Sequence, residues 1–168
     1  MVREISSGGV VIRPGAQGWD IAVIEPQKEP ETAGSGQSGK KKSQKVLMAL
    51  PKGLVDPGEK PDQTAIREVL EETGLEAVLI AKLGDTKYVY VRSWGDGERV
   101  FKIVSFYLLR YESGEIGVIR PEMKIEVRRA LWMPLEEAAR KLAYSGEKEM
   151  VKRAVTYLAA HPELREKA

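Results

Sequence analysis

Short runs rich in valine and isoleucine, separated by Gly and Pro, dominate the first third of the chain. They predict strands at residues 4–12 and 19–24, with a turn at Pro14 and Gly15 between them. A further apolar run predicts a strand at 46–50, followed by a Gly/Pro-rich loop at 51–60. This part of the chain therefore reads as β-structure.

The next segment, residues 61–73, has the pattern of a helix. It has Pro61 at its first position, acidic residues along its length and Gly74 at its end. Beyond it, strands are predicted at 77–83, 87–92, 99–110 and 129–133, with a hairpin turn at 94–97 and helices after Pro134 and at 146–160. Strands and helices do not alternate regularly, so we expect an α+β domain with helices packed on a sheet.

One segment departs from this pattern. Residues 26–44 are rich in Gly, Ser, Lys and Glu, which predicts a flexible insertion within a single domain spanning residues 1–168. The stretch GSGQSGKK within it imitates a phosphate-binding P-loop, but Lys41 stands where that motif needs Ser or Thr. A solvated basic loop is the interpretation we favour.

Composition restricts the chemistry. The chain has no cysteine and a single histidine, His161, so thiolate chemistry is excluded and a His-based mechanism nearly so. The net charge of +2 gives no reason to expect nucleic-acid binding, and no apolar run is long enough to span a membrane. A cytoplasmic location follows by default. Carboxylates, lysines, arginines and tyrosines must carry any reaction.

Three glutamates of the predicted helix, Glu68, Glu71 and Glu72, are spaced i, i+3, i+4 and share one face. Ile66, Val69 and Leu70 are predicted to bury the other side. Like charges at this spacing destabilise a helix by roughly 0.2–0.5 kcal/mol per pair. A cation would relieve that repulsion, and Mg²⁺ prefers oxygen ligands. The alternative is a solvated acidic face.

The full segment 53–75, GLVDPGEKPDQTAIREVLEETGL, resembles the Nudix box. Each specified position of the box is matched, by Gly53, Glu59, Arg67, Glu68, Val69, Glu71, Glu72, Gly74 and Leu75. The resemblance implies the Nudix fold, a mixed β-sheet sandwiched between α-helices. It also implies a Mg²⁺-dependent hydrolase of a nucleoside diphosphate linked to another group, in which Mn²⁺ substitutes for Mg²⁺.

The resemblance also implies the metal ligands: Glu68, Glu71, Glu72, the carbonyl of Lys52 and one later glutamate. For the last we choose Glu126, with Glu122 as the alternative; surface charge is the competing interpretation of both. Arg67 is expected to pair with Glu59 and fix the loop against the helix. Metal-bound water would attack phosphorus, and Glu71 or Glu126 would accept its proton.

The sequence indicates the residues that contact the substrate less specifically than it indicates the metal ligands. Lys52 and Lys102 are candidates for the phosphate chain, and Tyr88 or Tyr90 for stacking on a base; a surface lysine and strand tyrosines are the alternatives. Residues 50–59 resemble the start of the box in diadenosine polyphosphate hydrolases, although Leu54 replaces a histidine. We therefore predict diadenosine or other dinucleoside polyphosphates as the nucleotide-type substrate.

Three other functions stay open. ADP-ribose or another nucleotide sugar is disfavoured, because Tyr90 stands where such Nudix enzymes usually have a proline. Diphosphoinositol polyphosphates would suit the basic residues Lys40, Lys41, Lys42 and Lys45. A regulatory domain that binds nucleotides without cleaving them is disfavoured by the complete box.

Overall fold

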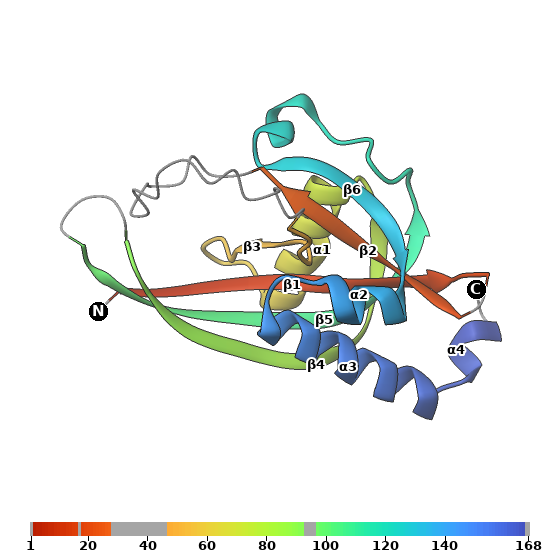
Figure 1. Cartoon of the computed structure of the whole chain (residues 1–168). Coiled ribbons are helices and arrows are strands. Elements are labelled where there is room, and N and C mark those ends of the chain that lie inside the picture. The colour runs from red at the N-terminus through yellow and green to blue at the C-terminus, as the bar shows by residue number, and fades with distance from the viewer. Residues whose placement is uncertain (1, 17, 28–46, 93–96, 167–168) are drawn as a thin grey trace, which may run out of the picture.

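The computed structural model describes residues 2–16, 18–27, 47–92 and 97–166, which form an α+β fold (Figure 1). Its strands are β1 (Val2–Pro14), β2 (Trp19–Pro26), β3 (Lys52–Leu54), β4 (Glu76–Val91), β5 (Arg99–Ser113) and β6 (Val127–Pro134). Its helices are α1 (Pro61–Thr73), the 3₁₀ helix η1 (Pro121–Ile125), α2 (Leu135–Lys141), α3 (Ser145–Ala160) and α4 (Glu163–Glu166).

The strands form one mixed sheet in the order β4-β5-β1-β2-β6, and β3 pairs with β1 outside this path. Strands β1 and β5 run parallel, with Ser7 opposite Ser105, and the other pairs are antiparallel. Strand β1 therefore lies at the centre and contacts three neighbours.

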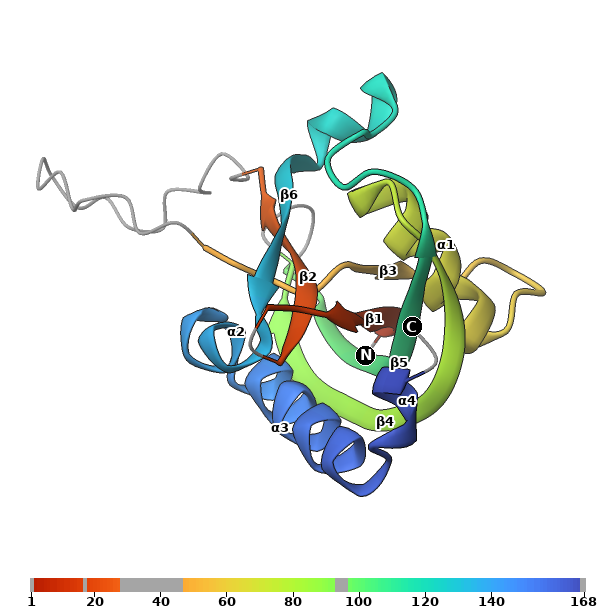
Figure 2. The ribbon, with the colours of Figure 1, turned by 90° about the vertical axis from the view of Figure 1, so that its right-hand side faces the viewer.

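Helices cover both faces of the sheet, as the resemblance implies (Figures 1 and 2). Successive residues of β1 point to opposite faces. Val10 belongs to the larger core with α2 and α3, whereas Val11 packs with Ala65 and Val69 of α1. The predicted sandwich is thus confirmed.

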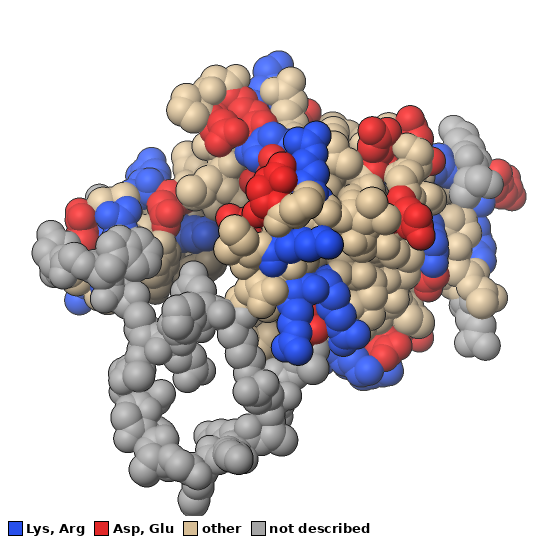
Figure 3. Space-filling model, turned by 90° about the horizontal axis from the view of Figure 1, so that it is seen from above, with Lys and Arg blue, Asp and Glu red and all other residues tan. Residues whose placement is uncertain are grey.

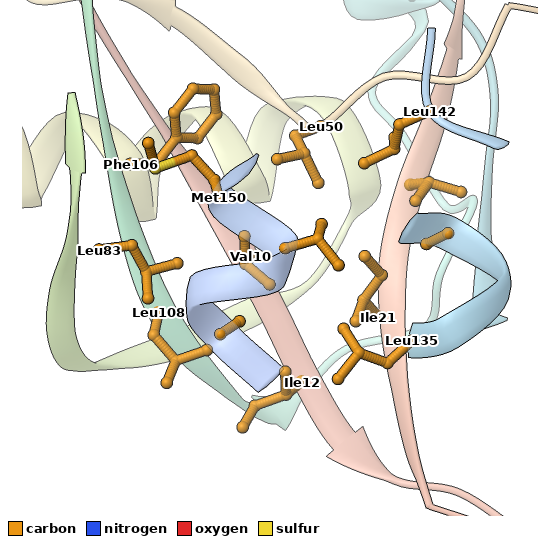
Figure 4. Close-up of a cluster of buried hydrophobic side chains, with 14 of the residues drawn as sticks. Val10, Ile12, Ile21, Leu50, Leu83, Phe106, Leu108, Leu135, Leu142 and Met150 are labelled. Atoms are coloured by element: carbon orange, nitrogen blue, oxygen red, sulfur yellow. The ribbon is translucent and has the colours of Figure 1, made fainter. Parts of the chain in front are cut away.

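The larger core lies between the sheet and helices α2 and α3 (Figure 4). Phe106 and Leu108 from β5 meet Met150 from α3 and Leu142 there, and each is at most 2% exposed. Full burial of such side chains contributes about 1.5–3 kcal/mol each. This core fixes α3 against the strands that carry the site described below.

Two strand predictions are wrong in detail. Within residues 47–50 only isolated bridges form, at Met48 and Ala49, and the regular pairing lies instead at β3, inside the predicted loop. The predicted strands 77–83 and 87–92 are one strand, β4. Register irregularities near Leu79 and Lys82 bend β4, so the chain passes Gly84 without a turn.

Helix α1 has the predicted bounds and ends at Gly74, whose φ of 83° is the left-handed conformation that glycine favours. The prediction that Leu70 is buried is wrong, because this residue is 40% exposed. The helix instead turns Glu68 and Glu72 inward, beside Ala65 and Val69. The C-terminal helix α3 also matches its prediction, although Val155 is 42% exposed.

Several predictions lie outside the described residues: most of the insertion at 26–44 with its P-loop-like stretch, the lysines at 40–45, and most of the turn at 94–97. None of the helices within the described ranges is long and apolar enough to cross a bilayer.

Candidate active site

Two buried glutamates of α1 face β3. Glu68 and Glu72 are 7% and 6% exposed, one helical turn apart. A carboxylate oxygen of Glu72 accepts the backbone N–H of Lys52 at 2.7 Å. The carboxyl of Glu68 lies so close to Gly53 that a Cβ built there would be 2.1 Å from Glu68 Cδ. The glycine is therefore required by the close approach of helix and strand.

Arg67 joins the preceding loop to the helix, as predicted. Its Nε and Nη2 donate to the two carboxylate oxygens of Glu59 at 2.8 and 2.9 Å, and Nη2 also donates to the Leu54 carbonyl. This hydrogen bonding lowers the pKa of Glu59 to about 2. Arg67 Nη1 reaches Glu68 at 2.9 Å and Glu71 at 3.1 Å. The guanidinium of Arg67 therefore orders the loop through Glu59 and also holds the carboxylates of Glu68 and Glu71.

The negative charge at this helix is only partly compensated. Burial, and after it the neighbouring charge of Glu71, raise the pKa of Glu68 to about 7, against the lowering effect of Arg67. Burial likewise raises the pKa of Glu72 to about 8, against the lowering effect of its hydrogen bond from Lys52. The carboxylate of Glu126 adds to both shifts, so this residue acts on the same site from the end of η1.

A pocket of about 240 Å³ opens beside Glu72. It is lined by Ser6, Ile24, Pro26, Ala49, Lys52, Gly53, Leu54, Glu72, Lys102 and Tyr144. Both predicted phosphate-binding lysines are therefore wall residues of one pocket. Burial lowers the pKa of Lys102, and the charge of Glu4 on the adjacent strand offsets only part of that shift.

The predicted tyrosines lie next to this pocket rather than in its wall. Tyr88 is opposite Lys102 in the β4–β5 ladder and is 44% exposed. The Tyr90 hydroxyl donates to the carboxylate of Glu4, which ties that side chain to β1. The two rings are 6.3 Å apart. Tyr88 is the better placed of the two to meet a ligand, and stacking stays a prediction.

A basic surface lies on the face of β6 and η1, where Lys and Arg side chains gather beside acidic ones (Figure 3). A second pocket of about 350 Å³ lies there, with Lys124, Arg128 and Arg129 in its wall. Both arginines pair with Glu25, which compensates part of their charge.

The family of the chain follows from its sequence. Residues 20–154 match the family described as NUDIX domain. The chain belongs to the Nudix family.

Among its relatives is the "Putative mutator protein MutT4" of Mycobacterium tuberculosis, 37% identical over 149 residues, which are 89% of this chain and 53% of the relative. Another is the 8-oxo-(d)GTP phosphatase of Mycolicibacterium smegmatis, 30% identical over 107 residues, 64% of this chain and 30% of the relative. The chain thus spans about half the length, or less, of these curated relatives.

Solved Nudix structures share the fold. A C. elegans Ap4A hydrolase binary complex superposes with a TM-score of 0.65 at 20% identity, covering 94% of this chain and 98% of the other. A MutT NUDIX hydrolase from Burkholderia pseudomallei gives a TM-score of 0.60 at 19% identity, with 91% and 98% covered. At these identities the likeness establishes the fold alone.

The Nudix box residues suit a divalent cation. Glu68 and Glu72 offer buried oxygen donors whose charge is only partly compensated, and Mg²⁺ binds donors of this kind. No three carboxylates within the described ranges already converge around a common point. The metal-ligand assignments of Glu68, Glu71, Glu72, Glu126 and the Lys52 carbonyl therefore stay predictions.

Sequence analysis missed three residues of this Nudix site. Glu147 is 4% exposed and pairs with Lys52, Tyr144 stands in the pocket wall, and the Ser6 hydroxyl is buried without a partner among the described residues. The sequence signals the burial of Glu147 but not its partners, because it precedes the apolar residues Met150 and Val151 by one helical turn.

Proposed function

We propose that this chain is a Mg²⁺-dependent pyrophosphohydrolase that acts on the phosphate chain of nucleotides, with dinucleoside polyphosphates as preferred substrates. The observation that carries the proposal is that one pocket has the buried acid Glu72 in its wall together with Lys52 and Lys102. Acids for a metal and cations for phosphate oxygens are the two requirements of phosphoryl transfer. Family membership makes hydrolysis the reaction to expect.

The proposed metal ligands are Glu68, Glu71, Glu72, Glu126 and the carbonyl of Lys52. A bound Mg²⁺, or Mn²⁺ in its place, would neutralise phosphate charge and lower the pKa of a water molecule. The same acidic side chains would repel a phosphate as long as no cation is bound. A phosphate would therefore bind only where a cation lies between it and these carboxylates.

The protein's own groups would then complete the reaction. Glu71 or Glu126 takes a proton from the attacking water, whose oxygen bonds to phosphorus while the bridging oxygen leaves with the departing nucleotide. Arg67 keeps the carboxylates ordered through its contact with Glu59. Lys102 donates to the remaining phosphate oxygens.

The placement of the two lysines favours a substrate with a long phosphate chain. A chain longer than two phosphates reaches both the acidic helix and Lys102, whereas ADP-ribose has only two phosphates to share between them. The exposed ring of Tyr88 beside Lys102 offers a surface on which a base can stack. A diadenosine polyphosphate satisfies both contacts.

A second candidate is an oxidised purine nucleoside triphosphate. The relative from Mycolicibacterium smegmatis carries the name 8-oxo-(d)GTP phosphatase, and such a substrate also has three phosphates and one base. It would use the same acids and lysines, so only a direct comparison separates the two.

The test is a panel of substrates with Mg²⁺ in ¹⁸O-labelled water, with products identified by mass spectrometry. Diadenosine tetra- to hexaphosphate, 8-oxo-dGTP, dGTP and ADP-ribose are compared by kcat/KM. We expect a diadenosine polyphosphate to rank first, with ATP or ADP among the products and one labelled oxygen per cleavage. If ADP-ribose ranks first, the assignment is wrong; if 8-oxo-dGTP does, the second candidate replaces it.

A further inference from the structure

A buried carboxylate that the reaction above leaves unused lies in the first turn of α3. Glu147 is 4% exposed and shares its helix face with Met150, Val151 and Ala154, which belong to the larger core. A charge placed on an apolar face is costly unless hydrogen bonds compensate it. Hydrogen-bond partners must therefore compensate the buried charge of Glu147.

Both oxygens of Glu147 are occupied by one short segment of chain. Oε1 accepts the backbone N–H of Leu50 at 2.7 Å, and Oε2 accepts the Lys52 ammonium at 2.7 Å. Pro51, between them, has no N–H to offer. The carboxylate thus binds the segment that leads into β3 on both sides of the proline.

The same segment holds the acidic helix from its other side. The Lys52 N–H donates to Glu72, and the Gly53 backbone is in contact with the Glu68 carboxyl. In Figure 2, α1 and α3 lie on different sides of β3. Residues 50–53 are therefore held between an acid of α3 and two acids of α1, and a shift of this segment would disturb its contacts with both Glu68 and Glu72.

The side chain of Lys52 depends on the same contact. A lysine has a flexible four-carbon stem and keeps one conformation only where a partner holds it. Here the ammonium is fixed by Glu147 and lies 5.3 Å from the centre of the Tyr144 ring, in the wall of the pocket.

We propose that Glu147 is a positioning residue for this Nudix site: it acts through residues 50–53 to keep Glu68 and Glu72 in the geometry that metal binding and hydrolysis need. The inference rests on the proposed metal-dependent function but not on the identity of the nucleotide. Among the described residues no hydrogen bond or ion pair joins Glu147 to either of those acids, so its effect is transmitted by the Leu50 backbone and by Lys52.

The test compares Glu147→Leu, which removes both contacts, with Glu147→Gln, which keeps an acceptor for the Leu50 N–H. Glu149→Gln, on an exposed face of the same helix, is the matched control. Each variant is assayed for Mn²⁺ affinity by calorimetry without substrate, and for kcat and KM with Mg²⁺ and diadenosine tetraphosphate, or the best substrate of the panel. Circular dichroism sets a temperature at which every variant is fully folded.

We expect Glu147→Leu to weaken Mn²⁺ binding and to lower kcat by about 10- to 100-fold, the usual effect of losing a group that orients metal ligands. Glu147→Gln should lose less kcat and Mn²⁺ affinity, and its KM should not rise, because it removes the negative charge that pairs with Lys52 in the pocket wall. The control should equal the wild type. If Glu147→Leu does not fold, the Gln variant carries the test.

Folded Glu147 variants with wild-type Mn²⁺ affinity and kcat, differing only in melting temperature, would reduce the residue to an ordinary stabilising contact and overturn the proposal. A rise in KM alone would also overturn it. If the wild type binds no Mn²⁺, both this proposal and the metal-dependent function fail. If it binds Mn²⁺ but leaves dinucleotides intact, only the choice of substrate fails.

Discussion

Replacing Gly53 by alanine should damage the site without unfolding the protein. A Cβ at this position would lie 2.1 Å from Glu68 Cδ, so the carboxyl must retreat by more than about 1 Å to reach ordinary contact at 3.4 Å. It can do so because it is the end of a flexible side chain. The backbone of Gly53 has no positive φ, so alanine brings no strain there and stabilises by about 0.4–1 kcal/mol through the unfolded chain.

The activity should respond much more strongly. A displacement of about 1 Å in a catalytic constellation costs on the order of 100-fold in rate. We expect Gly53→Ala to keep its melting temperature within a few degrees and to lose kcat on this scale, measured with Mg²⁺ on the best substrate of the panel. The Glu68→Ala background is the control, because without the carboxyl the added methyl should cost nothing further. Wild-type kcat in Gly53→Ala, or fully additive losses, would refute the reasoning.

Four further predictions concern the same site. Excess EDTA should abolish hydrolysis, and added Mg²⁺ or Mn²⁺ should restore it; full activity in the chelator would remove the proposed metal. Glu72→Gln should lower kcat by orders of magnitude with little change in folding, and Glu126→Gln should cost more than Glu122→Gln, or the choice of the late ligand is wrong. The pKa of Glu59 is lowered from 4.5 to about 2, so its stabilising contribution is present above pH 4.5 and is lost as the pH falls toward 2. The free energy of unfolding, measured with urea between pH 7 and 2, should therefore vary less with pH in Glu59→Gln than in the wild type. Tyr88→Ala should raise KM for diadenosine tetraphosphate about tenfold, from roughly 1–3 kcal/mol of lost stacking, at an unchanged melting temperature.

Local signals in the sequence predict the helix that carries the acids. Pro61 and Gly74 determine its ends, and the spacing of Arg67 from Glu59 fits their observed ion pair. The orientation of that helix was not predictable in the same way. Leu70 faces outward because Glu68 and Glu72 turn toward β3. The sequence did not predict β3, because its residues lie in the Gly/Pro-rich segment that was predicted to be a loop.

The missing parts of the site depend on contacts between distant segments. Glu147 acquires its role from Leu50 and Lys52, about a hundred residues earlier, and no helical spacing encodes that meeting. The break predicted between the strands 77–83 and 87–92 was wrong for a related reason. Strand β4 stays continuous because pairing with β5 continues past this glycine through local irregularities.

The parallel pairing of β1 with β5 bears on how the chain folds. Ser7 must find Ser105, and the central strand has no partner on that side until more than a hundred residues have left the ribosome. Pairing over such separations costs loop entropy before it gains any contacts, which makes folding slow. The hydrogen bond from Leu50 to Glu147 joins residues 97 positions apart and forms only after α3 exists. Catalytic competence should therefore appear among the last events of folding, later than most of the secondary structure.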